Sequence, residues 1–218
     1  MQAIFFDLDG TLIDSRADLA TAVNLTRRDF GLPELPATQV AGYVGEGLRL
    51  LVSRAMPEHP ERLDEAVERA RTHYRAHLLD QTVLYPFVTE ALGMLGAQGW
   101  KRAVVTNKPS EFIPLILEGL GVSGEFEALV GGGDAAAFKP DPAPVLLAAA
   151  RLGIDELRGS WMAGDHFTDL EVGRRIGLQR CYCRYGFGDP RGEAYDLAVD
   201  SLVELAKFVG QTGKVIGQ

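Results

Sequence analysis

Apolar and polar residues alternate along the chain in two ways, which separate an α/β region from a helical one. A short apolar run at residues 3–6 ends at an acidic loop, which is typical of a buried strand. Beyond residue 86, strand patterns alternate with amphipathic helix patterns. We expect strands within residues 3–6, 101–107, 127–133, 160–165 and 179–188, and helices at 89–99, 110–121, 142–153, 169–177 and 201–210. This alternation predicts a parallel sheet covered by helices on both faces.

The segment at residues 15–81 has helical spacing and no strand pattern. Three helices are expected there, at residues 15–32, 45–56 and 61–79. Ser15 followed by Asp18 resembles a capping arrangement at the start of the first helix. The pattern therefore predicts an α/β fold with a Rossmann-like, doubly wound parallel-sheet core at residues 1–14 and 82–218, into which an all-helical domain is inserted.

Composition narrows the class of protein. The chain has 218 residues, of which 46% are hydrophobic and 24% charged, as in an ordinary globular protein. A net charge of -8 argues against nucleic acid or an anionic membrane as the main partner, but not against a small anionic substrate. We expect no signal peptide and no membrane span, and a monomer or a homodimer. Cys181 and Cys183 form no disulfide framework, which favours the reducing cytoplasm.

Polar side chains follow the predicted strands, where a parallel sheet binds its ligands. In chain order these are Asp7, Asp9, Thr106, Asn107, Lys139, Asp165 and Asp169. Each short motif alone is also typical of a turn or a helix cap, so the specificity lies in the ordered set. Clustered carboxylates require a cation, and oxygen ligands favour Mg²⁺. A lysine and neutral donors at the same place favour a phosphate, so the set indicates phosphoryl transfer.

These motifs resemble those of the haloacid dehalogenase-like superfamily, on its phosphatase side. The resemblance covers the whole chain and rests on "DLDGT" at residues 7–11, "TN" at 106–107, "FKPDP" around Lys139 and "GDHFTD" at 164–169. The helical insert is similar to the family's cap domain. The stretches "YVGEGLRLLVSRAM" and "VVTNKP" are most similar to the phosphoglycolate phosphatase branch.

The resemblance implies a different role for each of the aspartates. Asp7 would be the nucleophile that forms an aspartyl-phosphate, and Asp9 would protonate the leaving alkoxide and then activate water. Asp7, the backbone carbonyl of Asp9 and Asp165 would hold Mg²⁺. Asp169 would contact the ion closely or through water.

The remaining motif residues would bind the phosphoryl group of a small phosphorylated metabolite, with 2-phosphoglycolate as the candidate. They are Gly10, Thr11, Thr106, Asn107 and Lys139. Lys139 would also offset the charge on the nucleophile, because a phosphate dianion and a carboxylate repel each other.

Substrate choice would depend on the cap and the loops that it meets. Tyr43, Glu46 and Arg49 are the cap candidates; Arg49 either pairs with a substrate carboxylate or is a solvated helix residue. Lys108, next to the second motif, is a further candidate to face the cap. His166 stands where many relatives carry serine, and it either touches substrate or caps a helix.

Alternatives to a phosphatase remain at this point. The family's dehalogenases lack the second aspartate, so Asp9 disfavours them, and phosphonate-cleaving relatives use a cap lysine that residues 42–52 do not offer. A phosphomutase of the β-phosphoglucomutase type shares all of these motifs. A non-catalytic phosphate-binding regulatory protein on the same scaffold is the alternative of another class.

Overall fold

The sheet at the centre of the molecule is parallel throughout. The computed structural model describes residues 1–212. Six strands lie in the order β5-β4-β1-β6-β7-β8, and every neighbouring pair is parallel. They are β1 (Ala3–Phe6), β4 (Lys101–Pro109), β5 (Ala128–Gly132), β6 (Trp161–Gly164), β7 (Gln179–Cys183) and β8 (Leu197–Val199). The sequence pattern indicates all of these strands except β8, a short strand at the sheet edge.

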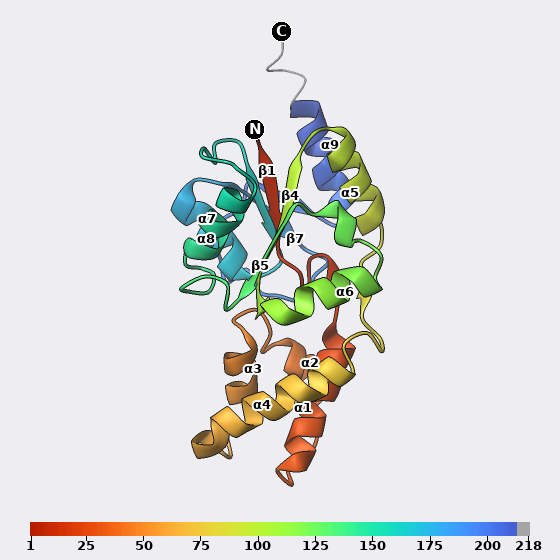
Figure 1. The fold of residues 1–218 in the computed structure, drawn as a ribbon, viewed down its shortest axis with the longest axis vertical. Coiled ribbons are helices and arrows are strands. Elements are labelled where there is room, and N and C mark those ends of the chain that lie inside the picture. The colour runs from red at the N-terminus through yellow and green to blue at the C-terminus, as the bar shows by residue number, and fades with distance from the viewer. Residues whose placement is uncertain (213–218) are drawn as a thin grey trace.

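Helices cover both faces of this sheet (Figure 1). The helices on one face are α5 (Val88–Ala97), α6 (Ile113–Gly119) and α9 (Leu202–Thr212), and those on the other are α7 (Ala143–Arg151) and α8 (Phe167–Ile176). Short 3-10 turns cover Ser110–Phe112 and Ser123–Glu125. Side chains of β1 alternate between the two faces: Ile4 and Phe6 pack on the first, and Ala3 and Phe5 on the second. This hydrophobic burial on both sides fixes β1 in the middle of the sheet.

The inserted segment is helical and has a hydrophobic core of its own. Its helices are α1 (Arg16–Asp29), α2 (Ala37–Ala41), α3 (Leu48–Ala55) and α4 (Leu63–Ala76), with a 3-10 turn at Pro60–Arg62. Val23, Val40, Val52 and Ala66 pack together at its centre. A two-stranded antiparallel ribbon of β2 (Ile13–Asp14) and β3 (Val83–Leu84) lies where the chain enters and leaves it. The predicted fold class, a doubly wound parallel sheet with an inserted all-helical unit, is confirmed.

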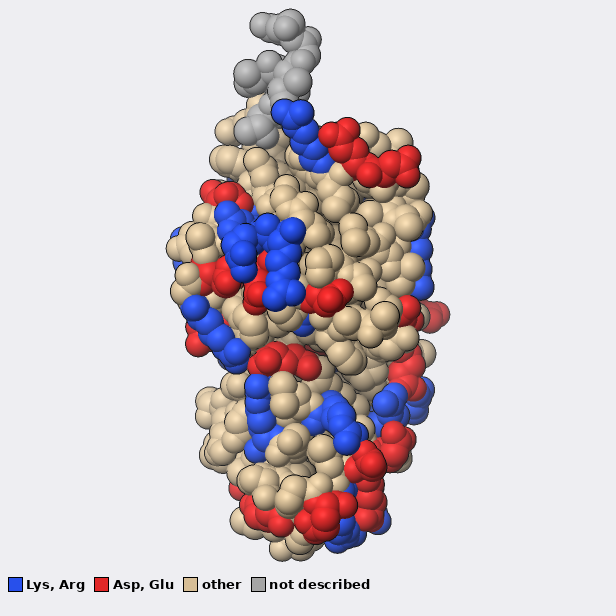
Figure 2. All heavy atoms as spheres, turned by 90° about the vertical axis from the view of Figure 1, so that its left-hand side faces the viewer, with Lys and Arg blue, Asp and Glu red and all other residues tan. Residues whose placement is uncertain are grey.

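The surface has no simple charge polarity on the face in Figure 2, where basic and acidic side chains lie interspersed over both the sheet core and the helical insert. Cys181 and Cys183 are free thiols, buried on one face of β7, as their spacing predicts. Within residues 1–212, no helix combines the length and the apolar character that a bilayer crossing requires.

The predicted capping role of Ser15 and Asp18 is wrong. Ser15 precedes α1, but its hydroxyl makes no bond to the helix and instead donates to Asp9 at 2.5 Å. The fully buried carboxylate of Asp18 accepts from the backbone N–H groups of Gln81 and Thr82 and from the Thr82 hydroxyl, at 2.6–3.1 Å. Asp18 therefore fastens the first turn of the insert to the segment by which the chain leaves it.

We predict that Asp18→Ala lowers the free energy of unfolding by about 3 kcal/mol, because it leaves two backbone donors without a partner in a buried place. Asp64→Ala is the matched control, since Asp64 is largely exposed and its ion pair with Arg49 should contribute about 0.5 kcal/mol or less. Urea unfolding followed by far-UV circular dichroism measures both. Equal midpoints for the two variants would contradict the anchoring role of Asp18.

Candidate active site

The polar residues after the strands come together at one edge of the sheet. Asp7 directly follows β1, Asp165 directly follows β6, and Asp169 lies in the first turn of α8. Lys139 reaches them from the loop between β5 and α7. Its ammonium group lies 2.6 Å from an oxygen of Asp169 and 3.1 Å from Oδ1 of Asp7. Residues 162 positions apart in sequence thus share one small polar site.

Three buried carboxylates form the centre of this site. Asp7, Asp165 and Asp169 each offer an oxygen within 4.8 Å of the others. Burial and the charges of Asp7 and Asp169 raise the pKa of Asp165 well above its usual range. Burial also raises the pKa of Asp169 to about 7, although Lys139 acts in the opposite direction. The raised pKa values measure the cost of holding negative charges together away from water.

This arrangement fits a hard divalent cation. All the candidate metal ligands are carboxylate oxygens. Oδ1 of Asp7 is buried and accepts no hydrogen bond within residues 1–212, since the nearby Lys139 makes only an ion pair with it. Lys139 donates instead to Asp169 and to the carbonyl of Val105, both at 2.6 Å. Burial opposes its charged form, but Asp169 and Asp7 outweigh burial and raise the pKa of Lys139. One cation among these oxygens would relieve the repulsion that Lys139 alone does not.

Residues of two loops surround the carboxylate of Asp165 and fix its position. Gly10 has φ +83°, and a Cβ there would lie 2.0 Å from Oδ2 of Asp165, so only glycine fits. The hydroxyl of Thr11 donates to Oδ1 at 3.3 Å. The backbone N–H groups of Phe187 and Gly188 donate to Oδ2 at 3.0 and 2.7 Å. Gly10 and Thr11 therefore contact a carboxylate of the cluster; the phosphate contacts expected of them remain a prediction.

Asp9 belongs to a different part of the site. Its carboxylate lies outside the three-carboxylate cluster and accepts from the Ser15 hydroxyl. The ammonium of Lys108 lies 2.7 and 3.0 Å from its two oxygens. Lys108 is buried and also lies over the ring of Tyr74 on α4, 4.5 Å from its centroid. Burial opposes its charged form, yet Asp9 and Tyr74 raise the pKa of Lys108.

Asn107 connects the core to the helical insert. Its amide nitrogen donates to the carbonyls of Gly45 and Lys139, both at 2.9 Å, and its amide oxygen accepts from the N–H of Lys139 at 2.8 Å. The hydroxyl of Thr106 accepts from the N–H of Lys108 at 3.2 Å. Both Thr106 and Asn107 line the cavity described below, as phosphate ligands would, and their phosphate contacts stay a prediction.

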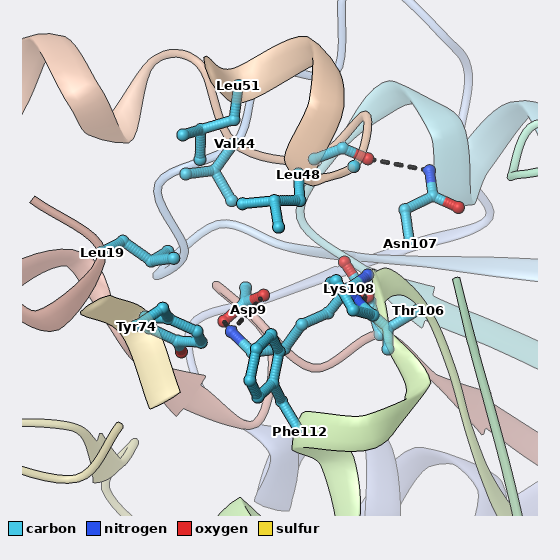
Figure 3. A pocket seen from close by; sticks show the side chains of 14 residues that line it. Asp9, Leu19, Val44, Leu48, Leu51, Tyr74, Thr106, Asn107, Lys108 and Phe112 are labelled. Carbon is cyan, nitrogen blue, oxygen red and sulfur yellow. Dashed lines mark hydrogen bonds and ion pairs between the residues drawn. The ribbon is translucent and has the colours of Figure 1, made fainter. Parts of the chain in front are cut away.

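A cavity of about 40 Å³ lies between the core and the insert. Its floor carries Asp7, Asp9 and the end of β4, and its other walls are apolar (Figure 3). The apolar lining residues are Leu19, Val44, Leu48, Leu51, Pro109 and Phe112. A buried water needs about 10–15 Å³, so the cavity has room for roughly three water molecules.

Of the three cap candidates, none lines this cavity. Arg49 is exposed and pairs with Asp64 at 2.6 Å, so its predicted contact with a substrate carboxylate is corrected in favour of the solvated-helix alternative. Glu46 pairs with Arg54 at 2.7 Å and with Arg191 at 3.1 Å. The exposed Tyr43 hydroxyl accepts from Gln39. The spacing of Arg49 along its helix could not reveal that it points away from the site.

His166 is a helix cap. Its ring nitrogen accepts from the N–H of Thr168, and Asp169 reciprocally accepts from the N–H of His166 at 3.1 Å. Burial lowers the pKa of His166 to about 4. Its ring packs against Gly45, where a Cβ would lie 2.8 Å away and φ is +114°. His166 thus shapes the contact between core and insert.

Several site residues have no local signal in the sequence. Tyr74 lies on a highly charged helix, and Phe187 and Gly188 lie in a loop beyond the fourth motif. Each reaches the site only through tertiary packing, so a motif search finds none of them.

Comparison with known proteins identifies the family. The family model described as haloacid dehalogenase-like hydrolase matches residues 4–183, which is most of the chain. The chain belongs to the haloacid dehalogenase-like hydrolases. Phosphoglycolate phosphatases are among the relatives of this hydrolase: that of Chromobacterium violaceum is 36% identical and the alignment covers 94% of this chain and 95% of the relative. That of Aquifex aeolicus is 35% identical, with 96% and 97% covered.

Solved structures of other haloacid dehalogenase-like proteins have the same fold. A crystal structure described as a predicted phosphoglycolate phosphatase from Haemophilus somnus matches with a TM-score of 0.88 and 28% identity, covering 95% of this chain and 97% of that one. The sequence resemblance to this family is therefore confirmed, and the core and the insert are both shared with a family member.

We predict that, at a pH where Asp165 is ionised, Asp165→Asn raises the melting temperature in the presence of EDTA by about 2–4 °C, because it removes one buried charge from the cluster. The amide oxygen can still accept from the two backbone N–H groups. The same variant should lose the stabilisation that added Mg²⁺ gives to the wild type.

Thermal melts with EDTA and with Mg²⁺ test this pair of effects, with the exposed Asp155→Asn as the control that should behave as the wild type. A lower melting temperature in EDTA, together with an unchanged response to Mg²⁺, would show that the cluster is not a cation site.

Proposed function

We propose that this protein is a Mg²⁺-dependent phosphatase that hydrolyses a small phosphate monoester through an aspartyl-phosphate at Asp7, with 2-phosphoglycolate as the first substrate to test. The observation that carries the proposal is the buried cluster of Asp7, Asp165, Asp169 and Lys139, with Asp9 beside it on the floor of the cavity. The relatives named phosphoglycolate phosphatase support the choice of substrate.

In the first step, a carboxylate oxygen of Asp7 attacks phosphorus and the bond to the ester oxygen breaks. Asp9 gives its proton to the departing alkoxide, so the alcohol leaves neutral. In the second step, Asp9 takes a proton from water, whose oxygen attacks phosphorus and displaces Asp7. The products are the alcohol and inorganic phosphate, and both aspartates return to their starting forms.

The surrounding residues make this attack electrostatically possible. Lys139 would offset the charge of the nucleophile and of the phosphoryl oxygens. Thr106 and Asn107 line the cavity and would donate to those oxygens, the amide of Asn107 once its hydrogen bond to Gly45 breaks. Asp7, Asp165, Asp169 and the backbone carbonyl of Asp9 would hold Mg²⁺. The ion would supply charge neutralisation between the carboxylate and the phosphoryl group.

Residues 15–81 would act as a cap, and residues 1–14 and 82–218 as the catalytic core. The aliphatic side chains of the insert close the cavity, whose volume of about 40 Å³ is too small to admit a phosphate ester from solution. Substrate entry therefore requires the insert to move on its two connections at β2 and β3. The hydrogen bond from Asn107 to the carbonyl of Gly45 would break and reform with each turnover.

Nothing in the cavity favours a phosphomutase over this proposal. A sugar leaving group carries several hydroxyls that need hydrogen-bond partners, and the walls contributed by Leu19, Val44, Leu48 and Leu51 are aliphatic. The complete set of acidic and basic groups likewise offers no reason to prefer a non-catalytic regulatory protein. Cys181 and Cys183, both unpaired, support a cytoplasmic location.

We predict that Asp7→Asn lowers the rate of phosphate release by about 10³-fold or more, because an amide cannot act as the nucleophile. Asp9→Asn should lower it by about 10²-fold or more on esters with a poor leaving group. EDTA should abolish the activity and Mg²⁺ should restore it.

The measurement is phosphate release from a panel of small phosphate esters, with Asp155→Asn as the control. Activity of Asp7→Asn within tenfold of the wild type would refute the nucleophile assignment. Isomerised hexose phosphate as the main product would support a mutase, and no turnover on any ester would support a binding protein.

A further inference from the structure

Lys108 is the only cation among the described residues that line the cavity. It lies on the wall next to Asp9, while Lys139 lies deeper, with the metal-site carboxylates. Figure 3 shows its ammonium group at Asp9, with Tyr74 and Phe112 beside it and Leu19, Val44 and Leu48 across the cavity. This part of the cavity would receive the leaving group, because Asp9 must reach the ester oxygen. We call Lys108, Tyr74 and this aliphatic wall the leaving-group pocket.

Two polar groups of the leaving-group pocket have room for a further partner within residues 1–212. Lys108 carries three N–H groups, its hydrogen bonds there go to the two oxygens of Asp9, and its ammonium group also lies over the ring of Tyr74. The side chain of Tyr74 is buried, and its hydroxyl has no hydrogen-bond partner among residues 1–212. Burial raises the pKa of Tyr74 to about 12, so the hydroxyl keeps its proton near neutral pH. A buried donor without an acceptor is costly, and its usual explanation is a ligand or an ordered water.

The donors of Lys108 and Tyr74 and the aliphatic wall favour some kinds of leaving group over others. An uncharged alkyl group would leave both donors unsatisfied, and a polyol would place several hydroxyls against leucine and valine side chains. A short chain that ends in a carboxylate would put its methylene against the aliphatic wall and its oxygens against the two donors. Charge-assisted hydrogen bonds in such a buried place are strong and specific.

We propose that Lys108 and Tyr74 recognise a carboxylate on the leaving group, so that the enzyme prefers phosphate esters of small hydroxycarboxylic acids to uncharged esters of the same size. This inference rests on the proposed phosphatase activity and identifies the substrate class of the same site. It also replaces Arg49, which lies on the outer surface, as the residue that selects for a carboxylate.

The test compares 2-phosphoglycolate with the phosphate ester of glycolamide, an isostere in which a neutral amide replaces the carboxylate. We expect the wild type to have a kcat/KM for the acid at least about tenfold higher than for the amide. In Lys108→Met this ratio should fall to about one, and in Tyr74→Phe by about threefold, because only one neutral donor is lost. Lys108→Arg should keep most of the preference, since it keeps the charge.

The ratio of kcat/KM for the acid to kcat/KM for the amide distinguishes recognition of the carboxylate from a general loss of activity. Lys108 also holds Asp9, so its removal should lower the rate on both esters, and only a change in their ratio reports the substrate carboxylate. Arg49→Met, which removes an exposed cation of the helical insert, should leave the ratio unchanged. Thermal melts confirm that each variant is folded.

The outcomes distinguish a failure of carboxylate recognition from a failure of the proposed phosphatase activity. Equal kcat/KM for acid and amide in the wild type, or a preference that survives Lys108→Met, overturns carboxylate recognition while phosphate release by the wild type still supports the phosphatase. No release from either ester, or full activity of Asp7→Asn, overturns the proposed function itself.

Discussion

The structure depends on the mutual repulsion of three buried carboxylates held around one lysine. Asp7, Asp165 and Asp169 come from separate strand ends, and their approach is costly, as the raised pKa values of Asp165 and Asp169 show. The parallel sheet makes the approach possible, because burial of β1 on both faces leaves its carboxyl end no freedom to move away. Glycine at positions Gly10, Gly186 and Gly188 removes side chains that would collide with Asp165. The fold therefore confines carboxylates whose repulsion protonation or a bound cation would relieve.

The same edge of the sheet also controls how the helical insert meets the core. Asn107 holds the loop of Lys139 with two hydrogen bonds and reaches Gly45 of the insert with a third. His166, the cap of the helix that carries Asp169, packs against the same glycine. The contact between the insert and the core is thus made by residues that also contact Lys139 and Asp169. A shift of the loop at Gly45 would disturb both the lysine loop and the carboxylate cluster.

The sequence predicted the sheet core, the helical insert and the convergence of its motif residues, because these depend on short-range periodicity and on the ends of parallel strands. It failed where a partner comes from far along the chain. Ser15 and Asp18 have the spacing of a cap, but Asp9 and the segment at Thr82 offer them buried, charge-assisted bonds that outweigh a local one. Arg49 and Tyr74 both lie on insert helices, and only packing decides which of them faces the cavity. Chain periodicity cannot show that choice when charged residues surround both.

The balance of buried charge explains why two lysines accompany the four aspartates of this site. Asp7, Asp165 and Asp169 share Lys139, and Asp9 has Lys108 to itself. When Asp9 is ionised and Lys108 is charged, their pair is neutral. When Asp7, Asp165 and Asp169 are all ionised beside Lys139, that deeper group has an excess of two negative charges, which is the charge that one divalent cation supplies. The two lysines are therefore not equivalent. In the proposed mechanism Lys139 would serve the metal and the phosphoryl group, and Lys108 lies where the rest of the substrate would bind, so substitutions at the two positions should separate chemistry from substrate choice.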